Sequence, residues 1–168
     1  MLTADLLALK KYIPEDFEVY YTMVKDDRVM RYITGKGLTE EEARKKFDSI
    51  IRINEEENEL GYFKVFDDEG KHIGDCKLER YDQDKSLLEV GYIVKKEFWG
   101  MGYGTLICER MLALADWVAP SADIVGIIDP ENTASKGLLE KFNFKTYFIG
   151  IEDELPTEKL RLSRGRLG

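Results

Sequence analysis

Three glycines at alternate positions, Gly100, Gly102 and Gly104, mark the stretch of this sequence with the clearest chemical meaning. Such spacing suits neither a packed strand nor a helix interior, because glycine weakens both. The glycines lie between an apolar segment ending at Val94 and a helical pattern starting near Thr105. A strand, a glycine-rich loop and a helix N-terminus together bind phosphate, since bare amides approach the anion and the helix dipole favours it. The alternative is a plain turn from strand to helix.

The loop differs from the two commonest nucleotide-binding motifs. No Gly-Lys-Ser/Thr follows, so it is not a Walker A loop, and it lacks the third glycine of the dinucleotide fingerprint. No carboxylate lies between Phe98 and Cys108 to repel an anion. The pattern therefore predicts phosphate binding through backbone amides.

Composition limits the other possibilities. Lys and Arg total 25 against 33 Asp and Glu, and the net charge of −8 argues against a patch-driven nucleic-acid binder. One His and two Cys are too few for a four-ligand zinc site, so no metal is expected. Without a secretory signal or an apolar run of about 18 residues, we expect a cytoplasmic chain with reduced thiols and no membrane span.

The elements that must position the loop follow from residue periodicity. Short helices are expected after Pro14 and Asp26, and a longer helix from Thr39, which forms a capping box with Glu42. Strands are expected at 6–13, 62–66, 72–78, 86–94, 123–128, 144–149 and 157–162, helices at 105–118 and 132–142, and a solvated loop at 152–156. This order predicts an α+β (mixed α/β) fold, because a Rossmann array would alternate from its start.

The segment Trp99-Gly100-Met101-Gly102-Tyr103-Gly104-Thr105 resembles the pyrophosphate loop of the GNAT superfamily of acyl-CoA-dependent N-acetyltransferases. The ribosomal-protein N-terminal acetyltransferase branch is the most similar. Residues 27–33 with 38–43, 88–94, and 132–135 with 139–144 also resemble that branch, in order along the chain. The resemblance implies one GNAT domain over 1–168, with a mostly antiparallel sheet of about six or seven strands splayed at the cofactor cleft. It leaves a homodimer open.

The resemblance also implies a place for acetyl-CoA. Its pyrophosphate would bind the amides of Met101 through Thr105, and its pantetheine would pair with the backbone of Ile93 and Val94 like an added strand. The Val94 amide would then hold the thioester oxygen. Asn132 and Ser135 would contact the cofactor, although a plain helix start after Asp129 explains Asn132 as well. The implied cofactor-binding set is Tyr92, Ile93, Val94, Trp99, Gly100, Met101, Gly102, Tyr103, Gly104, Thr105, Asn132 and Ser135.

Acetylation of an amine requires a base that accepts a proton. Glu89 is the candidate general base, because it shares a strand face with Ile93 and the family often carries Glu there; the alternative is an ordinary residue of a solvated sheet face. We assign no general acid, since Leu139 stands where many family members have Tyr. The single histidine, His72, is expected to be a strand-surface residue rather than a catalyst.

Together these observations predict an acetyl-CoA-dependent N-acetyltransferase that acts on a primary amine by direct attack in a ternary complex. The acceptor candidates are a protein N-terminus, which the branch suggests, a polyamine, an amino acid and an aminated antibiotic. Residues 90–147 carry a net charge of only −1 (seven carboxylates, six cations), so most of the acidity lies where the acceptor is expected and hints at a cationic one. The alternative is a non-catalytic acyl-CoA-binding sensor or scaffold.

Overall fold

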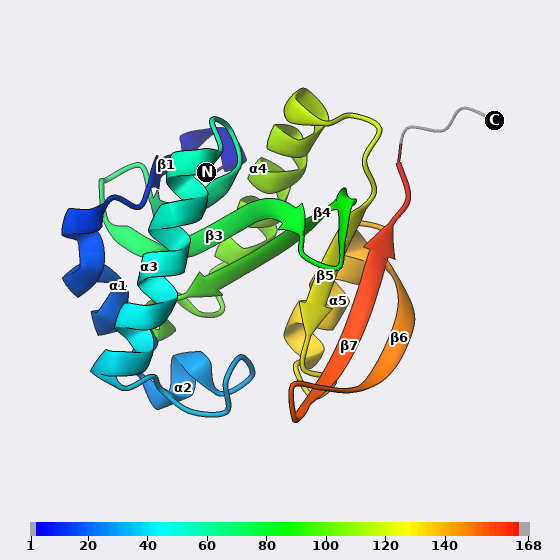
Figure 1. Ribbon diagram of the computed structural model, residues 1–168. Helices are drawn as coiled ribbons and strands as arrows, with labels where there is room; N and C mark the ends of the chain where they lie inside the picture. The colour runs from blue at the N-terminus through cyan, green and yellow to red at the C-terminus, as the bar shows by residue number, and fades with distance from the viewer. Residues whose placement is uncertain (1–2, 165–168) are drawn as a thin grey trace.

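The computed structural model describes residues 3–164. Within them one seven-stranded sheet has the order β1-β2-β3-β4-β5-β7-β6 (Figure 1). The strands are β1 (Ala8–Lys11), β2 (Gly61–Phe66), β3 (His72–Tyr81), β4 (Asp84–Val94), β5 (Ile124–Ile128), β6 (Lys145–Glu152) and β7 (Leu155–Leu162). The α-helices are α1 (Phe17–Val24), α2 (Asp27–Met30), α3 (Glu40–Glu56), α4 (Tyr103–Val118) and α5 (Thr133–Lys141).

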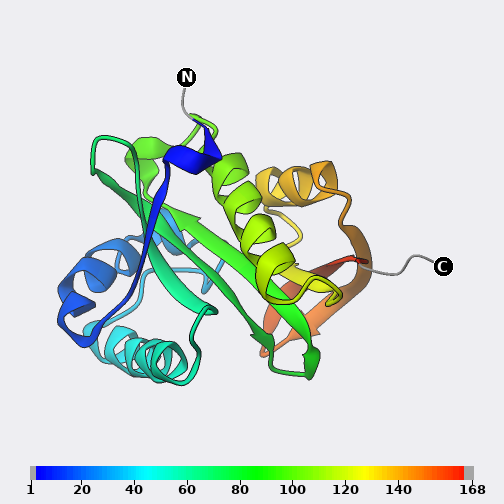
Figure 2. The ribbon, with the colours of Figure 1, turned by 90° about the horizontal axis from the view of Figure 1, so that it is seen from above.

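The helices cover the two faces of the sheet unequally. Seen from above, α1 and α3 lie on one face of the β1–β4 half, whereas α4 lies on the opposite face and α5 continues that layer over β5 (Figure 2). The α4 layer buries Ile107, Met111 and Ala115 completely against the sheet. This arrangement confirms the predicted mixed α/β class and the mostly antiparallel sheet.

The only parallel strand pair in the described sheet, β4 with β5, is also short. Its register joins Leu88 to Ile124, Glu89 to Val125 and Val90 to Gly126, and pairing stops there although both strands continue. A parallel pair requires a crossover connection, and α4 provides it. The last four residues of β4 therefore diverge from β5, as the family resemblance implies.

Two local predictions can be compared with the structure at atomic detail. The capping box at the start of α3 is confirmed, because the Glu42 amide donates to Thr39 Oγ1 (3.2 Å) and the Thr39 amide to Glu42 Oε1 (2.9 Å). The segment 152–156 is largely exposed, as predicted, but its loop is shorter than expected. Asp153 and Glu154 both adopt left-handed backbone (φ 50° and 66°) and form a two-residue turn, so β6 and β7 extend to meet it.

The first predicted strand is shorter than expected. A 3-10 turn occupies Ala4–Leu6, and β1 keeps only Ala8–Lys11 of the range 6–13.

Asn143, which follows α5, adopts the left-handed backbone conformation (φ 72°), and asparagine tolerates this conformation at a helix end. No helix among residues 3–164 is long and apolar enough to cross a bilayer.

Candidate active site

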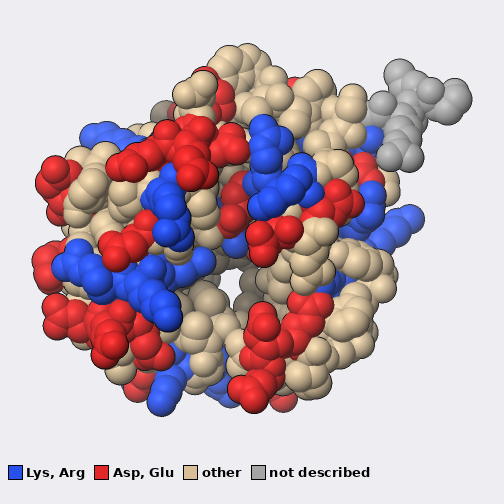
Figure 3. Space-filling view, in the orientation of Figure 1, with Lys and Arg blue, Asp and Glu red and all other residues tan. Residues whose placement is uncertain are grey.

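The divergence of β4 from β5 opens a large cleft. Its volume is about 1590 Å³, and it is lined by the end of β4, the loop before α4, the start of α5 and parts of α2 and α3. In the space-filling view it forms an opening through the molecule near the centre, with Lys and Arg side chains toward α1–α3 and Asp and Glu along its lower right rim (Figure 3). Both sheet faces are thus accessible at this point.

The glycine-rich loop lies at one side of this cleft. Gly100 and Gly102 have φ values of 77° and 85°, and a Cβ on either would meet no atom within 4 Å. Glycine is therefore needed there for backbone conformation rather than for space. Gly102 is the N-cap and α4 begins at Tyr103, two residues earlier than predicted, so the amides of Tyr103, Gly104 and Thr105 belong to the first turn and lack intrahelical partners. Amides in this position at a helix N-terminus can bind an anion.

Gly104 serves a different purpose, since it lies inside the first turn of α4. A Cβ built there would lie 3.0 Å from Leu138 Cδ1 and 3.4 Å from Tyr92 Cε2. The missing side chain lets α4 approach both β4 and α5. Met101, by contrast, is exposed at the tip of the loop.

Trp99 fastens the loop to the end of β4. Its indole Nε1 donates a hydrogen bond to the Val94 carbonyl at 2.7 Å, while half of its surface remains exposed. The Val94 carbonyl is therefore occupied, and the Val94 amide is the group left for a ligand.

Strand alternation decides which backbone groups of β4 face the cleft. The Leu88 amide donates toward β5 (Asp123 carbonyl, 3.0 Å) and the Lys95 amide toward β3 (Ile73 carbonyl, 2.9 Å). Even-numbered residues thus turn their backbone to the cleft, which selects Tyr92 and Val94. Ile93 lines the cleft with its side chain instead, so the expected backbone pairing through Ile93 needs correction.

Asn132 and Ser135 lie together at the start of α5. Asn132 Oδ1 accepts a hydrogen bond from the Ser135 amide at 3.1 Å, so Asn132 is the N-cap. The helix thus starts later than the alternative with Asp129 as N-cap expected, but the start of the helix does account for Asn132. Ser135 Oγ lies 3.2 Å from Tyr92 OH, and all three side chains line the cleft. Leu139 is buried against Gly126, where a Cβ would approach it to 2.8 Å.

The sheet face beneath α1–α3 carries four titratable side chains next to Ile93, and we call these five residues the carboxylate face: Asp75, Lys77, Glu79, Glu89 and Ile93. Lys77 Nζ lies 2.7 Å from Glu89 Oε2 and 3.0 Å from Glu79 Oε2. Burial alone would lower the pKa of Lys77, but Tyr62 and the two carboxylates raise it above its ordinary value. The predicted base, Glu89, therefore lines the cleft, but its carboxylate forms an ion pair with Lys77.

Asp75 is the functional candidate that sequence reasoning missed. Its side chain lines the cleft with only 5% of the residue exposed, and Oδ2 accepts a hydrogen bond from Tyr12 OH at 3.1 Å. Burial raises the pKa of the carboxyl group to about 7, against the lowering effects of Tyr12 and two lysines. Strand alternation could have pointed to Asp75, because it places the Asp75 and Lys77 side chains on the same face of β3.

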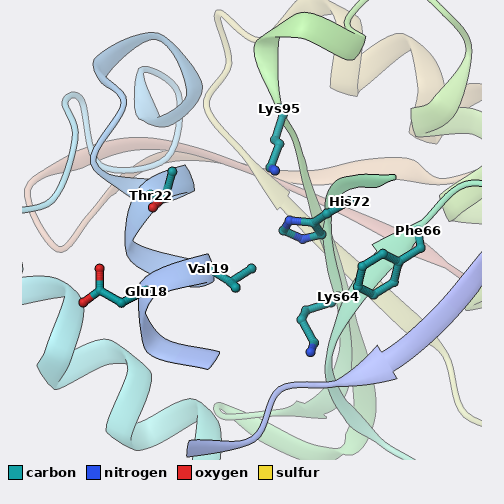
Figure 4. Close-up of a pocket in the computed structure, with 7 residues that line it drawn as sticks. All are labelled: Glu18, Val19, Thr22, Lys64, Phe66, His72 and Lys95. Atoms are coloured by element: carbon teal, nitrogen blue, oxygen red, sulfur yellow. The ribbon is translucent and has the colours of Figure 1, made fainter. Parts of the chain in front are cut away.

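His72 lies outside the cleft. It lines a smaller hollow of about 440 Å³, where its ring points toward Val19 and Thr22 of α1, with Lys95 and Lys64 on either side (Figure 4). Its Nε2 is enclosed and has no hydrogen-bond partner among residues 3–164, and burial lowers its pKa to about 4. The expectation of a strand-surface residue thus understates its burial.

Two solved structures of similar fold contain coenzyme A. The spermidine N-acetyltransferase from Vibrio cholerae, in complex with CoA and spermine, has a TM-score of 0.76 at 17% identity over 95% of this chain and 96% of that one. RimL, a ribosomal L7/L12 alpha-N-protein acetyltransferase in complex with coenzyme A, has a TM-score of 0.77 at 12% identity over 95% and 94%. At such identities these similarities establish the fold.

Sequence comparison adds the family. A Bacillus licheniformis protein named uncharacterized N-acetyltransferase p20 is 26% identical over 148 residues, which cover 86% of this chain and 82% of that protein. The family described as acetyltransferase (GNAT) domain matches residues 7–145, most of the chain, including the glycine-rich loop and the cleft-lining ends of β4 and β5. The chain therefore belongs to the GNAT family of acetyltransferases.

Proposed function

We propose that this protein transfers an acetyl group from acetyl-CoA to a primary amine, by direct attack within a ternary complex. The observation that carries the proposal is the position of the Val94 amide. It turns into a cleft that has anion-binding amides at one side and the carboxylate face at the other. A thioester and an amine can thus approach the same point from opposite sides of the sheet.

The donor would occupy the side of α4 and α5. The amides of residues 101–105 would hold its pyrophosphate, assisted by the dipole of the sixteen-residue helix α4. Its pantetheine would extend along Tyr92 and Val94, as an added strand does. The Val94 N–H would then donate to the thioester oxygen as negative charge develops there. The CoA complexes of the Vibrio cholerae protein and of RimL support this donor.

Direct attack is favoured over a covalent acyl-enzyme. Cys76 and Cys108 are both buried, and burial raises the pKa of the Cys76 thiol well above its ordinary value and that of Cys108 to about 12. Neither thiol is an activated nucleophile, because the thiolate is the reactive form. A carboxylate of the cleft would take the proton from the acceptor amine, and Glu89 is the one that the sequence indicates.

The acceptor side of the cleft mixes charges of both signs. Arg28, Arg31 and Lys46 line its α2–α3 wall, and Glu152 and Asp153 line the opposite wall at the β6–β7 turn. This mixture does not favour the strongly cationic acceptor that the overall charge suggests. We propose a single primary amine, on a small molecule or at a protein N-terminus, as the acceptor class.

Thiol release tests the proposal directly. The protein would be incubated with acetyl-CoA and a panel of amines comprising peptides with free N-termini, polyamines and amino acids, and free CoA would be measured. We expect release that requires an amine. If the protein binds CoA but no amine of the panel promotes thiol release, acetyl transfer is refuted. That result would favour the non-catalytic acyl-CoA-binding alternative, which is motivated by Leu139 at the place where many family members have Tyr.

The cofactor loop has a matched pair of glycines for its own test. Gly102 in the loop and Gly70 in the β2–β3 turn have nearly equal φ values (85° and 82°) and equally open surroundings. Gly102→Glu places a negative charge in the proposed pyrophosphate site, so we expect CoA to bind at least about tenfold more weakly, or 1.4 kcal/mol. Gly70→Glu adds the same charge and the same strain outside the cleft. Equal CoA affinities for the two variants would refute the loop assignment.

A further inference from the structure

The geometry points to Asp75, rather than Glu89, as the catalytic base that accepts the proton of the acceptor amine. This inference rests on the proposed acetyl transfer and names the group that performs one step of it. Four observations support it: strand register, enclosure, the commitment of Glu89 to Lys77, and the chemistry of the buried carboxyl group.

Register places Asp75 beside the reaction centre. Asp75 is directly opposite Ile93 in the β3–β4 ladder, and Gly74 is opposite Val94, whose amide is the proposed oxyanion donor. Side chains of directly opposed residues lie on the same face with Cβ atoms about 5 Å apart. Gly74 makes this approach possible, since a Cβ on it would lie 2.0 Å from the Ile93 carbonyl oxygen. The Asp75 carboxyl group therefore lies on β3 opposite Ile93, the residue that precedes Val94 on β4.

Glu89 is farther from that point and already engaged. It precedes Ile93 by four residues on the same strand, which corresponds to about 13 Å along β4. Its Oε2 lies 2.7 Å from Lys77 Nζ, and Lys77 also contacts Glu79. Glu89 therefore serves to neutralise Lys77 and to shape the wall of the cleft.

The surroundings of Asp75 suit a base that works near neutral pH. Among the described residues no cation lies within ion-pair distance of it, and its hydrogen-bond donor is the neutral phenol of Tyr12. The titratable groups that face it are Tyr12 after β1, Tyr20 on α1, Lys46 on α3 and Lys77 on β3. Burial outweighs them and raises the pKa of Asp75 to about 7, where a base combines availability with proton affinity.

The proposed step is balanced as follows. The Asp75 carboxylate removes one proton from the acceptor ammonium, R–NH₃⁺, directly or through one water molecule. The neutral nitrogen attacks the thioester carbon, and a C–N bond forms while negative charge collects on the oxygen near the Val94 amide. The C–S bond then breaks, and the departing thiolate takes the second proton of the nitrogen. Asp75 finally releases its proton to solvent, so the products are amide, CoA thiol and H⁺.

The pH dependence of kcat/KM tests this role in the full-length protein. With an acceptor found in the thiol-release panel, the wild type should show an ascending limb with an apparent pKa near 7. Asp75→Asn should lower kcat about 100-fold or more and move the limb to the pKa of the acceptor amine itself. Glu89→Gln should keep the limb near 7. Asp67→Asn, which alters another buried aspartate outside the cleft, is the matched control and should leave the profile unchanged.

Two further measurements separate catalysis from a structural role. Because the pKa of Asp75 is raised on folding, its ionisation costs stability as pH rises from 4 to 7, so Asp75→Asn should melt above the wild type at pH 8 while binding CoA equally well. Tyr12→Phe removes the hydrogen bond that lowers the pKa of Asp75, and should therefore shift the ascending limb to higher pH.

The possible outcomes are distinct. An active wild type whose limb near pH 7 moves to the pKa of the acceptor amine in Asp75→Asn and stays near 7 in Glu89→Gln supports the assignment. An active wild type whose limb survives in Asp75→Asn overturns it and leaves the acetyltransferase proposal standing. Loss of CoA affinity or of stability in Asp75→Asn also overturns it, since the residue would then be structural. A wild type that releases no thiol with any amine overturns the proposed function together with this role.

Discussion

Replacing Lys77 by Met would remove the cation that joins two strands of the carboxylate face. Lys77 Nζ lies 2.7 Å from Glu89 and 3.0 Å from Glu79, with side chains exposed by 22%, 16% and 17%. Glu79 and Glu89 are also directly opposite each other in the ladder, so the variant leaves two like charges facing across adjacent strands. We therefore expect Lys77→Met to be much less stable than the wild type.

The expected size follows from the burial. Breaking a buried ion pair by removing one partner costs about 3–5 kcal/mol, and partial exposure places this cluster at the lower end, about 3 kcal/mol. For a domain of this size such a loss lowers Tm by about 6–12 °C. The pKa of Lys77 is raised, so the stabilising effect of its charge is present at neutral pH and declines as pH rises above its unfolded value of 10.5.

Urea denaturation followed by circular dichroism measures this loss, with an unchanged m-value as the sign that folding remains two-state. The triple variant Lys77→Met, Glu79→Gln, Glu89→Gln removes the whole charge cluster and should recover most of the stability. Lys85→Met, which breaks an exposed pair with Asp82, should leave the midpoint unchanged. A loss below about 1 kcal/mol for Lys77→Met, or a triple variant no more stable than the single one, would refute the reasoning.

Three more outcomes are expected. Trp99→Phe removes the hydrogen bond to the Val94 carbonyl and should weaken CoA binding several-fold by calorimetry with little change in Tm. Gly102→Ala should destabilise the protein by about 1–2 kcal/mol in urea because φ is positive there, whereas any cost of Gly104→Ala should come from the contact of its Cβ with Leu138 and Tyr92. The pKa of His72 is lowered, so stability should fall by up to about 3 kcal/mol as pH drops from 6.5 to 4; an equally steep fall in His72→Gln would contradict this.

Features that depend on neighbouring residues were predictable from the sequence. The capping box of Thr39 and Glu42 and the glycine loop before α4 are local patterns. The first lies at the start of α3 and the second at the start of α4. The splay of β4 from β5 was expected from the family resemblance, and the structure places it directly after Val90. The glycine loop and the splay together define the cofactor half of the candidate site.

Features that depend on strand register were not predictable. Asp75 gains its position only because β3 pairs with β4 so that it faces Ile93, and that register passes through an irregularity between Arg80 and Tyr81. The sequence also gave no reason to expect Lys77 between two carboxylates, since Glu79 and Glu89 are ten residues apart and meet only in the folded hairpin. Burial of Asp75 likewise depends on Tyr12, which is distant in sequence.

The opening through the molecule also has a kinetic consequence (Figure 3). With the donor at one mouth and the acceptor at the other, as we propose, neither ligand would lie on the other's exit route. Spent CoA would then be exchanged while the acetylated product is still bound, and the product would leave while CoA stays. Initial-velocity plots should therefore intersect as in random addition, and a bulky acceptor should slow neither the entry nor the release of the cofactor.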